Sequence, residues 1–582
     1  MDTVKVIING REYEVKAGST VLEAARAASI DIPTLCYLKD INEIGACRMC
    51  LVEVSEGGRP FRMVASCVYP VTDGMVIKTE SPKITQSRKL NLELLLSNHN
   101  QDCLSCIRST NCELQKLCNM YGVRSSNFAG EKTQTTMDSS SPSIIRDNSK
   151  CILCRRCVAA CKNLQGIGVI GANNRGFDTE IGCAFENELA STSCVNCGQC
   201  IVACPTGALH EKDDTDDIFA ALADPSKKVY ICAAPSIRAT IGECFGYEPG
   251  TDTEGKMVAA LKRLGFDGVF DMNFTADLTI MEEGYELIGR IKENKNLPLI
   301  TSCSPGWIKY CEHYFPEFTD NLSSCKSPQQ MFGAVMKTYF AEKNGIDPKD
   351  IFFVSAIPCT AKKFEVKRDG QSAAGVPDVD VAVTTREVAR MIEKAGIDFK
   401  ALPDEEFDNP FHIGSGAGAI FGATGGVMEA ALRTAAEVLT GKELTKLEFD
   451  DVRGMEGVKF AKYDLGGITV NVAVASGTAN AKALLNKIKA GEVDVQFVEI
   501  MACPGGCING GGQPTQPAVV RNNVDLKALR ASILYNADAN KLAIRKSHEN
   551  PQIKMIYDEF FGEPNSHKAH EILHTTYVKR GL

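Results

Sequence analysis

Cysteines are the residues of this sequence best suited to do chemistry. The chain has 582 residues and 25 cysteines, most of them in tight groups before residue 205. It starts MDTVKVIING, without the basic and apolar stretches of a secretory signal, so we expect a cytoplasmic protein with reduced thiols. In a reducing compartment, grouped cysteines are metal ligands or catalytic thiols more often than disulfides. The spacing within each group indicates what it binds.

The first group has four cysteines with wide outer gaps. Cys36, Cys47, Cys50 and Cys67 form a C-x10-C-x2-C-x16-C pattern. Its central pair can bind one iron from a single turn, and the outer pair can complete a [2Fe–2S] site. A zinc site or scattered free thiols are the alternatives. The strand-like VKVIING and REYEVKAG, followed by the helical VLEAARAAS, favour the cluster, because they predict a ferredoxin-like β-grasp domain over residues 1–80.

The second group combines one histidine with three cysteines. His99, Cys103, Cys106 and Cys112 form an H-x3-C-x2-C-x5-C pattern in residues 81–123, where KLNLELLLSNHN predicts an amphipathic helix. A neutral imidazole in place of one thiolate makes a [4Fe–4S] cluster less negative and shifts its potential. A structural zinc site with three cysteines and one histidine is the alternative.

Two further cysteine runs share the spacing C-x2-C-x2-C-x3-C. They are Cys151, Cys154, Cys157 and Cys161, and then Cys194, Cys197, Cys200 and Cys204. The second run ends in Pro205, whereas the first has Lys162 at that place. The pattern resembles two-cluster bacterial ferredoxins, in which the fourth cysteine of each run binds the other cluster. This resemblance implies one [4Fe–4S] cluster on Cys151, Cys154, Cys157 and Cys204, and another on Cys194, Cys197, Cys200 and Cys161.

The order of these patterns predicts an α+β multidomain chain. Residues 150–212 form the two-cluster ferredoxin-like domain, and the Ser-, Thr- and Asn-rich residues 124–149 are interpreted as a linker. Over residues 226–515, apolar runs such as VYICAAP and VDVAVTT alternate with helical stretches such as TEGKMVAALKRLG. That alternation predicts a large α/β domain with ligands beyond the carboxyl ends of its strands. Residues 516–582 are charged and predict a helical extension over this domain.

The composition argues against several kinds of partner. The net charge of −9 does not favour a nucleic-acid surface. No run of 18 apolar residues is present, so no membrane span is expected. No G-x-G-x-x-G or P-loop occurs in a convincing strand–helix context, so we do not expect the chain itself to bind a nucleotide.

Three motifs in the α/β region resemble the signature segments of iron-only ([FeFe]) hydrogenases. They are TSCSPGW (301–307), IPCTAKKFE (357–365) and EIMACPGGCINGGGQP (499–514). The cluster groups also resemble those of modular hydrogenases, so the resemblance covers nearly the whole chain. It implies reversible H2 oxidation and proton reduction at an H-cluster, a [4Fe–4S] cubane joined to a two-iron unit with CO, cyanide and dithiolate ligands. One [2Fe–2S] and three [4Fe–4S] relay clusters would carry the electrons.

The resemblance also implies which residues hold the H-cluster. Cys359, Cys503 and Cys507 are expected to bind the cubane, with Cys507 bridging to the two-iron unit. The family has two adjacent cysteines in the first motif, where this sequence has Cys303 and Ser304. A serine therefore stands where the fourth thiolate is expected. Ser304, Cys303 or a non-protein ligand can complete the site, and the sequence leaves these three open.

The remaining pocket residues are assigned by position in the family motifs. Ser236, which follows Pro235, and the cationic Lys362 are expected to contact the cyanide ligands, because a positive charge suits an anionic ligand in a dry site. Met501 and Ile357 are expected to supply apolar walls.

A proton path to the surface is implied by the same resemblance. Its members are Cys303, Glu283, Ser323, Glu286 and Arg290. Glu283 and Glu286 are spaced i,i+3, and Arg290 follows Glu286 at i+4, so the three can share one helix face. An ordinary salt-bridge ladder on a helix surface is the alternative.

The outer clusters suggest a subunit of a larger NAD(P)-linked or electron-bifurcating complex. Ferredoxin and flavin- and NAD(P)-binding subunits are the expected partners, and a stand-alone ferredoxin-dependent hydrogenase is the runner-up. An electron-transfer subunit like that of complex I shares the first two cluster groups but is not expected to carry the three C-terminal motifs. A non-catalytic sensor or iron–sulfur assembly factor is the remaining alternative, which Ser304 keeps open. The other cysteines, interpreted as core or surface thiols, are Cys118, Cys183, Cys232, Cys244, Cys311 and Cys325.

Overall fold

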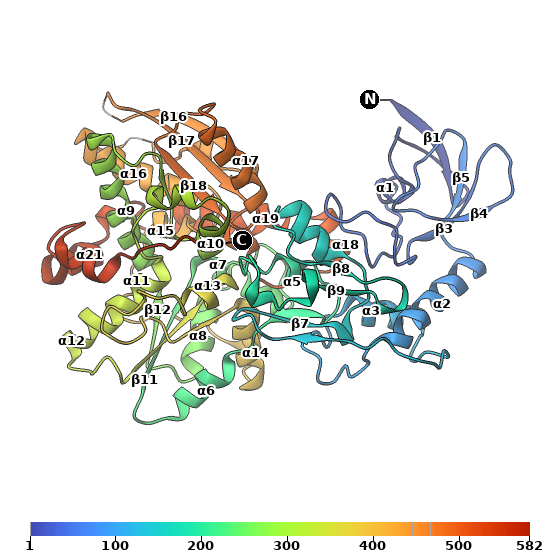
Figure 1. Cartoon of the computed structure of the whole chain (residues 1–582), viewed down its shortest axis with the longest axis horizontal. Helices are drawn as coiled ribbons and strands as arrows, with labels where there is room; N and C mark the ends of the chain where they lie inside the picture. The colour runs from blue at the N-terminus through green and yellow to red at the C-terminus, as the bar shows by residue number, and fades with distance from the viewer. Residues whose placement is uncertain (1, 445, 466, 582) are drawn as a thin grey trace.

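The computed structural model describes residues 2–444, 446–465 and 467–581. Figure 1 shows the N-terminal sheet at one end of the molecule, the large α/β part at the other, and the cysteine-rich segments between them. Among the described residues, no helix combines the length and the apolar character needed to cross a membrane.

The N-terminal unit is a five-stranded sheet covered by one helix, as the ββα start predicts. The strand order is β2-β1-β5-β3-β4, with β1 and β5 parallel and the other pairs antiparallel. Thr20 caps the helix and forms a capping box with Glu23, so the sequence signal for the helix start is realised. The elements are β1 (Thr3–Ile8), β2 (Arg11–Lys16), α1 (Val21–Ala27), β3 (Leu51–Ser55), β4 (Arg62–Ala65) and β5 (Met75–Lys78).

The next segment is helical, and the expected linker needs a correction. Part of residues 124–149 forms two strands, and the second of them pairs with a strand that follows the last cysteine run. Short strands with long-range partners leave no periodic signal in the sequence. The elements of this middle part are α2 (Pro82–Asn98), α3 (Glu113–Tyr121), β6 (Met137–Asp138), β7 (Ile144–Asp147), α4 (Arg156–Ala159), β8 (Gly171–Asn173), β9 (Glu180–Gly182), α5 (Gln199–Ala203) and β10 (Leu209–Glu211).

Two four-stranded sheets organise the large α/β part. The first, in the order β12-β11-β14-β15, is fully parallel, and the second, β13-β18-β17-β16, is parallel except for its edge strand β16. Near-continuous apolar runs form the inner strands, as expected for parallel sheets buried on both faces. The strands are β11 (Lys228–Ala233), β12 (Gly268–Asp271), β13 (Leu299–Ile300), β14 (Ile351–Ala356), β15 (Val381–Val383), β16 (Val458–Asp464), β17 (Thr469–Ser476) and β18 (Phe497–Met501).

The helix α9 is the central helix of this part. Its side chains contribute to two hydrophobic clusters: Phe274 and Leu278 to one, Ile280 and Leu287 to the other. A helix that is apolar on several faces must be covered on all of them, which makes α9 a rigid support for polar groups. The helices are α6 (Thr215–Ala223), α7 (Pro235–Arg238), α8 (Glu254–Arg263), α9 (Asn273–Glu293), α10 (Pro305–Tyr314), α11 (Pro328–Val335), α12 (Ala341–Asn344), α13 (Ala361–Glu365), α14 (Thr385–Lys394), α15 (Gly416–Ile420), α16 (Gly426–Thr440) and α17 (Thr478–Lys489).

The C-terminal extension is helical, as expected, and it also completes the core. Ile553, Ile556, Phe561 and Leu573 belong to the same hydrophobic cluster as the residues of β11, α9 and α11. Removing this segment would therefore uncover apolar side chains of the α/β part. Its helices are α18 (Ala518–Asn523), α19 (Leu526–Asn536), α20 (Pro551–Ile556) and α21 (His567–Leu573).

Candidate active site

One cavity of the α/β part gathers residues from all three signature motifs. It lies where β11, β13, β14 and β18 end, as expected for a ligand site in a sheet of this kind. Its walls include the expected Pro235, Ser236, Cys303, Ser304, Ile357, Cys359, Lys362, Met501 and Cys507. They also include Met272, Ala276, Gln329 and Phe421, which the sequence did not single out.

The cysteines of the second and third motifs lie close together in this region. Burial raises the pKa of Cys503 well above its usual value, and the neighbouring Cys359 raises it further. Burial, again with Cys359 nearby, raises the pKa of Cys507 to about 12. Thiols in such surroundings keep their protons unless a cation displaces them, so this group is suited to bind a metal cluster rather than to act as free nucleophiles.

Two glycines let the third motif pass close to other backbone. Gly506 has φ +95°, and a Cβ there would lie 2.8 Å from the Thr424 nitrogen. A Cβ on Gly511 would lie 2.3 Å from the Cys197 carbonyl oxygen. Both positions therefore require glycine, the first for its backbone conformation as well as for space.

Cys303 and Ser304 face different neighbours although they are adjacent. The Ser304 hydroxyl accepts the Ala502 N–H at 3.2 Å, which directs it toward the segment that carries Cys503. Cys303 packs in the cluster that contains Met501, and its pKa is raised by burial first and then by the nearby Glu283. The serine thus occupies the side of the cavity where the cubane cysteines lie.

Several buried polar atoms of the cavity lack a partner. Among the described residues, Ser236 Oγ and Gln329 Oε1 have no hydrogen bond. Lys362 Nζ instead contacts Glu365 Oε2 at 2.8 Å, a buried ion pair that the sequence did not predict. A buried donor without a partner costs free energy, so Ser236 is suited to bind a polar ligand inside the cavity.

The expected proton-path residues lie beside the cavity on and around α9. Ser323 Oγ donates to Glu286 Oε2 at 2.8 Å, and Arg290 binds the other oxygen of Glu286 at 2.6 Å. Glu283 is buried, and neither of its carboxyl oxygens has a hydrogen-bond partner among the described residues. Burial, with the charge of Glu286 added, raises the pKa of Glu283 to about 8, so it is mostly protonated at neutral pH. No hydrogen bond joins it to Cys303 in the described part of the chain.

Two separate cavities gather the cysteines of the two ferredoxin-like runs. One is lined by Cys151, Cys154, Cys157 and Cys204, and the other by Cys161, Cys194, Cys197 and Cys200. Each cavity gathers the four cysteines that the crossed ferredoxin arrangement assigns to one cluster.

The first outer group lies at the end of the N-terminal sheet. Cys50 and Cys67 have their sulfurs 3.3 Å apart, and a hydrogen bond from Cys47 lowers the pKa of Cys36 to about 6. Asn42 donates both to the Cys36 carbonyl at 2.8 Å and to the Cys154 carbonyl at 3.1 Å. Asn42 therefore bridges the loop of this group to the cavity lined by Cys151, Cys154, Cys157 and Cys204.

The second outer group contacts the same cavity from another side. His99 is buried, burial lowers its pKa, and its Nδ1 has no hydrogen-bond partner among the described residues. A neutral imidazole is the form that binds metals. The Cys112 sulfur lies 3.8 Å from the Pro205 carbonyl oxygen, next to Cys204.

The inner ferredoxin-type group meets the main cavity through its backbone. Thr360 Oγ1 donates to the Asn196 carbonyl at 2.7 Å, and Gln199 donates to the Asn509 carbonyl at 2.8 Å. The Cys503 sulfur lies 3.9 Å from the Cys197 carbonyl oxygen. The two metal-binding loops are therefore in direct contact.

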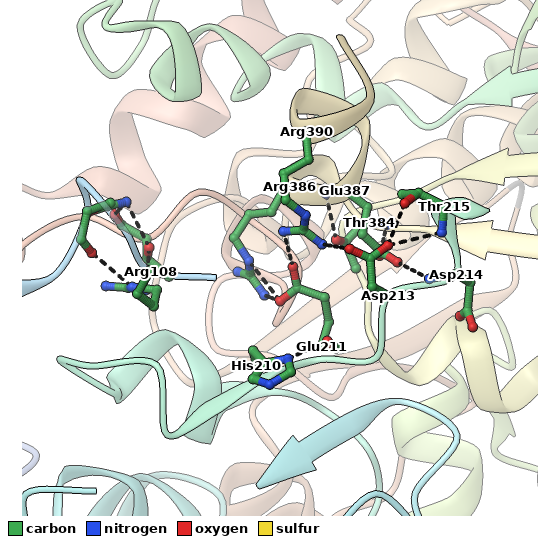
Figure 2. A network of polar contacts seen from close by, with 12 residues as sticks. Arg108, His210, Glu211, Asp213, Asp214, Thr215, Thr384, Arg386, Glu387 and Arg390 are labelled. Atoms are coloured by element: carbon green, nitrogen blue, oxygen red, sulfur yellow. Dashed lines mark hydrogen bonds and ion pairs between the residues drawn. The ribbon is translucent and has the colours of Figure 1, made fainter. Parts of the chain in front are cut away.

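An ion-pair network around the buried Glu211 also connects the ferredoxin-like part to the third motif (Figure 2). Glu211 of β10 binds Arg386 at 2.6 Å and Arg390 at 2.8 Å, both from α14. Arg386 also donates to the carbonyls of Gly511 (2.9 Å) and Gln513 in the third motif. Burial alone would raise the pKa of Glu211, but the two arginines hold it well below its usual range. This clamp ties the ferredoxin-like part to the loop that carries Cys507.

Family models match almost the whole chain. Residues 227–511 match "Iron only hydrogenase large subunit, C-terminal domain", and residues 524–580 match "Iron hydrogenase small subunit". Residues 1–82 match a "2Fe-2S iron-sulfur cluster binding domain". Residues 88–127 match the "NADH-ubiquinone oxidoreductase-G iron-sulfur binding region", and residues 141–210 match "NADH-quinone oxidoreductase subunit 3, ferredoxin-like domain".

Individual relatives cover the full length as well. The chain is 49% identical to the NADP-reducing hydrogenase subunit HndD of Solidesulfovibrio fructosivorans, with all of both chains covered. It is 45% identical to Iron hydrogenase 1 of Clostridium pasteurianum, covering 99% of this chain and 100% of that protein. A solved structure of an [FeFe]-hydrogenase from Chlamydomonas reinhardtii matches with 43% identity and a TM-score of 0.57, over 64% of this chain and 100% of that one.

Proposed function

The chain belongs to the iron-only hydrogenase family, with an H-cluster domain and N-terminal iron–sulfur domains, and from that premise we propose how its residues divide the work of H2 turnover. The observation that supports this division is the cavity that gathers residues of all three motifs. Its lining residue Cys359 lies near Cys503, whose sulfur contacts the Cys197 carbonyl, and its lining residue Cys303 lies near the buried Glu283.

We assign Cys359, Cys503 and Cys507 as cubane ligands, with Ser304 beside them. When bound, the H-cluster supplies an open iron site and a basic amine for heterolytic cleavage of H2. Ser236 and Lys362 would hold the cluster through polar contacts with its cyanide ligands, and for this contact Lys362 would leave its ion pair with Glu365. Met501 and Ile357 keep the cavity apolar, which excludes water and strengthens these polar contacts.

The proton route uses Cys303, Glu283, Ser323, Glu286 and Arg290. Cys303 lines the cavity and exchanges a proton with Glu283, whose raised pKa lets it hold a proton at neutral pH. Ser323 is hydrogen-bonded to Glu286, which carries the proton to the half-buried end of the route at Arg290.

The electron route uses one [2Fe–2S] and three [4Fe–4S] clusters. The group of Cys194, Cys197, Cys200 and Cys161 would hold the relay cluster nearest the cubane, because its loop touches Cys503 and Gly511. The group of Cys151, Cys154, Cys157 and Cys204 is next along the electron route. Both outer groups contact it, so the route forks toward two surface clusters.

The two outer clusters would give electrons two places to leave the chain, which suits a subunit that exchanges electrons with more than one carrier. We propose that this subunit works with flavin- and NAD(P)-binding partner subunits and with ferredoxin. The full-length similarity to a subunit of an NADP-reducing hydrogenase supports the NAD(P)-linked partner.

The test is H2-dependent dye reduction by the anaerobically purified chain, matured with the two-iron unit, together with infrared detection of CO and cyanide bands. Activity with these bands is the expected result. Bands without turnover would favour a sensor or an interrupted proton route. Absence of bands after maturation would overturn the proposed ligand set. Reduction of NAD(P)+ only after adding a flavoprotein subunit would support the complex over the stand-alone enzyme.

A further inference from the structure

Glu286 has a second hydrogen-bonded route, which leads away from Arg290 to a histidine near the C-terminus. Residues 573–577 run antiparallel to residues 323–326: the Lys326 N–H donates to the Leu573 carbonyl, and the Thr575 N–H donates to the Ser324 carbonyl, both at 2.8 Å. This pairing places His574 beside Ser324. His574 Nδ1 lies 2.8 Å from Ser324 Oγ, which in turn lies 3.4 Å from Glu286 Oε1.

Buried carboxyl and hydroxyl groups surround the His574 ring. His574 is 8% exposed, and its Nε2 lies 3.1 Å from Oε2 of the fully buried Glu282. Glu282 also accepts from the Tyr557 hydroxyl and from the Asn565 N–H. The titratable groups that face the imidazole are therefore Glu282 and Glu286 of α9, Tyr557, Cys325 and His570.

His570 connects this site to solvent. It is exposed, and its ring centroid lies 4.0 Å from that of His574, one helical turn along α21. An imidazole is the side chain that changes charge between about pH 5 and 8, the range in which a hydrogenase must exchange protons with water.

We propose that His574 is a proton store of the relay, which exchanges a proton with Glu286 through the Ser324 hydroxyl. The proposal rests on the proton route described above. In the outward direction, the Glu286 carboxyl gives its proton to Ser324 Oγ while the hydroxyl proton of Ser324 moves to Nδ1 of His574. The products are a carboxylate, an unchanged serine and an imidazolium, so charge and atoms balance. With Nε2 donating to Glu282, Nδ1 is the nitrogen free to accept.

The branch from Glu286 to His574 passes through one hydroxyl group, that of Ser324. Ser324 has one proton, so it accepts from Glu286 only while it donates to His574, and the reverse transfer reverses both bonds. Protons can therefore be held one step from Glu286 without occupying it. We infer that the store supplies protons during H2 production and receives them during H2 oxidation.

The test compares His574→Asn and His574→Gln with the wild-type holoenzyme. Asparagine can keep the bond to Ser324 and glutamine can reach Glu282, so each variant keeps one structural contact while neither side chain titrates. The readout is the pH profile of H2 production in dilute buffer, with and without added imidazole. His548→Gln is the matched control, because His548 is a partly buried histidine bound to Glu437, outside the hydrogen bonds of the relay.

We expect both His574 variants to lose about tenfold in rate below neutral pH, less than the roughly 100-fold minimum typical of a general acid–base group, because the branch through Arg290 stays in place. Imidazole should restore the rate, and the control should keep the wild-type profile. A wild-type profile in both variants, or an equal loss at every pH that imidazole does not restore, would overturn the proposal. Glu286→Gln separates the two levels: full activity of that variant would refute the relay itself, whereas its inactivity beside wild-type His574 variants would refute only the store.

Discussion

The proposed electron route and the proposed proton route start at the same cavity, but they are built from different kinds of structure. The electron route consists of cysteines on short loops, where neighbouring groups touch through backbone carbonyls such as those of Asn196 and Cys197. The proposed proton route includes Glu283 and Glu286 on the long central helix α9, and the Ser323 hydroxyl from another segment donates to Glu286. Loops of this kind take their cohesion from bound metal, whereas the helix takes its rigidity from packing.

The difference predicts different responses to mutation. A lost thiolate should remove a cluster and with it all conduction, while a lost carboxyl should slow one step and leave every cluster in place. The following changes test that contrast.

The largest effect is expected for Cys503→Ser. A serine hydroxyl is much harder to deprotonate than a thiol, so the cubane should be lost and H2-dependent dye reduction abolished. Electron paramagnetic resonance should show the relay clusters without the cubane signal. Cys244→Ser is the control, because Cys244 lies outside every cluster group. Full activity of the Cys503 variant with an unchanged cluster spectrum would refute the ligand assignment.

Glu283→Gln should leave all cluster signals intact and still lower turnover about 100-fold or more, the size expected when a proton-transfer group is removed. The amide fills the same space but cannot carry a proton in this way. Glu293→Gln, at the exposed end of the same helix, is the control and should behave as wild type. Turnover within a factor of about two of wild type would remove Glu283 from the route.

Glu283 also makes stability depend on pH. Its folded-state pKa of about 8 lies above the ordinary value of 4.5. The neutral form is therefore favoured by folding: its contribution is complete below the unfolded pKa and is lost as pH rises through about 8. The melting temperature of the wild type should fall across that range more steeply than that of Glu283→Gln. Parallel curves would contradict the raised pKa.

The ion pairs of Glu211 with Arg386 and Arg390 tie the ferredoxin-like part to the loop that carries Cys507. They should contribute more to the stability of the fold than to the rate of turnover. Glu211→Ala removes the buried carboxylate that binds two partly buried arginines, which should destabilise the fold by up to about 3 kcal/mol, the low end for a broken buried pair, because Arg390 keeps its contact with Asp213. Asp216→Ala is the matched control, because it breaks an exposed pair with Lys394 on the same helix as Arg386 and should cost at most about 1 kcal/mol. Thermal unfolding and protease sensitivity measure both. Equal effects of the two variants would show that the clamp is not a structural tie.

The smallest effect is expected for Ser304→Cys. An added thiolate at the cubane should slow the release of iron to a chelator, without a large change in turnover. Iron release from protein prepared without the two-iron unit measures this directly. An unchanged rate of release would mean that residue 304 does not face the cubane.

The two routes also differ in how far the sequence predicts them. The two ferredoxin-like cysteine runs could be identified from spacing alone, because the members of each run lie within a few residues of one another and metal chemistry restricts the gaps. The expected linker at 124–149 was wrong in part, because β6 and β7 are short and β7 pairs with the distant β10. The ββα start and the parallel sheets were predicted, since capping and periodicity are local.

Around the cavity, the sequence missed residues that carry no spacing signature. Gln329 and Phe421 line the cavity from helices whose sequences resemble ordinary buried segments. Glu365 was not expected to bind Lys362, although the i,i+3 spacing could have suggested it. His574 was missed because its contact with Ser324 joins residues that are 250 positions apart. Long-range polar contacts depend on the completed fold, and no local pattern reports them.

The pairing of residues 573–577 with residues 323–326 has a further consequence, because the segment at 524–580 matches a family model described as a small subunit. Here it is joined by peptide bonds to the part it completes. Its docking is therefore intramolecular, with an effective concentration on the order of millimolar that does not fall on dilution. The contact between His574 and Ser324 can accordingly be weak by itself and still stay formed. The fraction of molecules that have this contact does not depend on the protein concentration. A single cut in the chain before this segment would make the same contact depend on concentration.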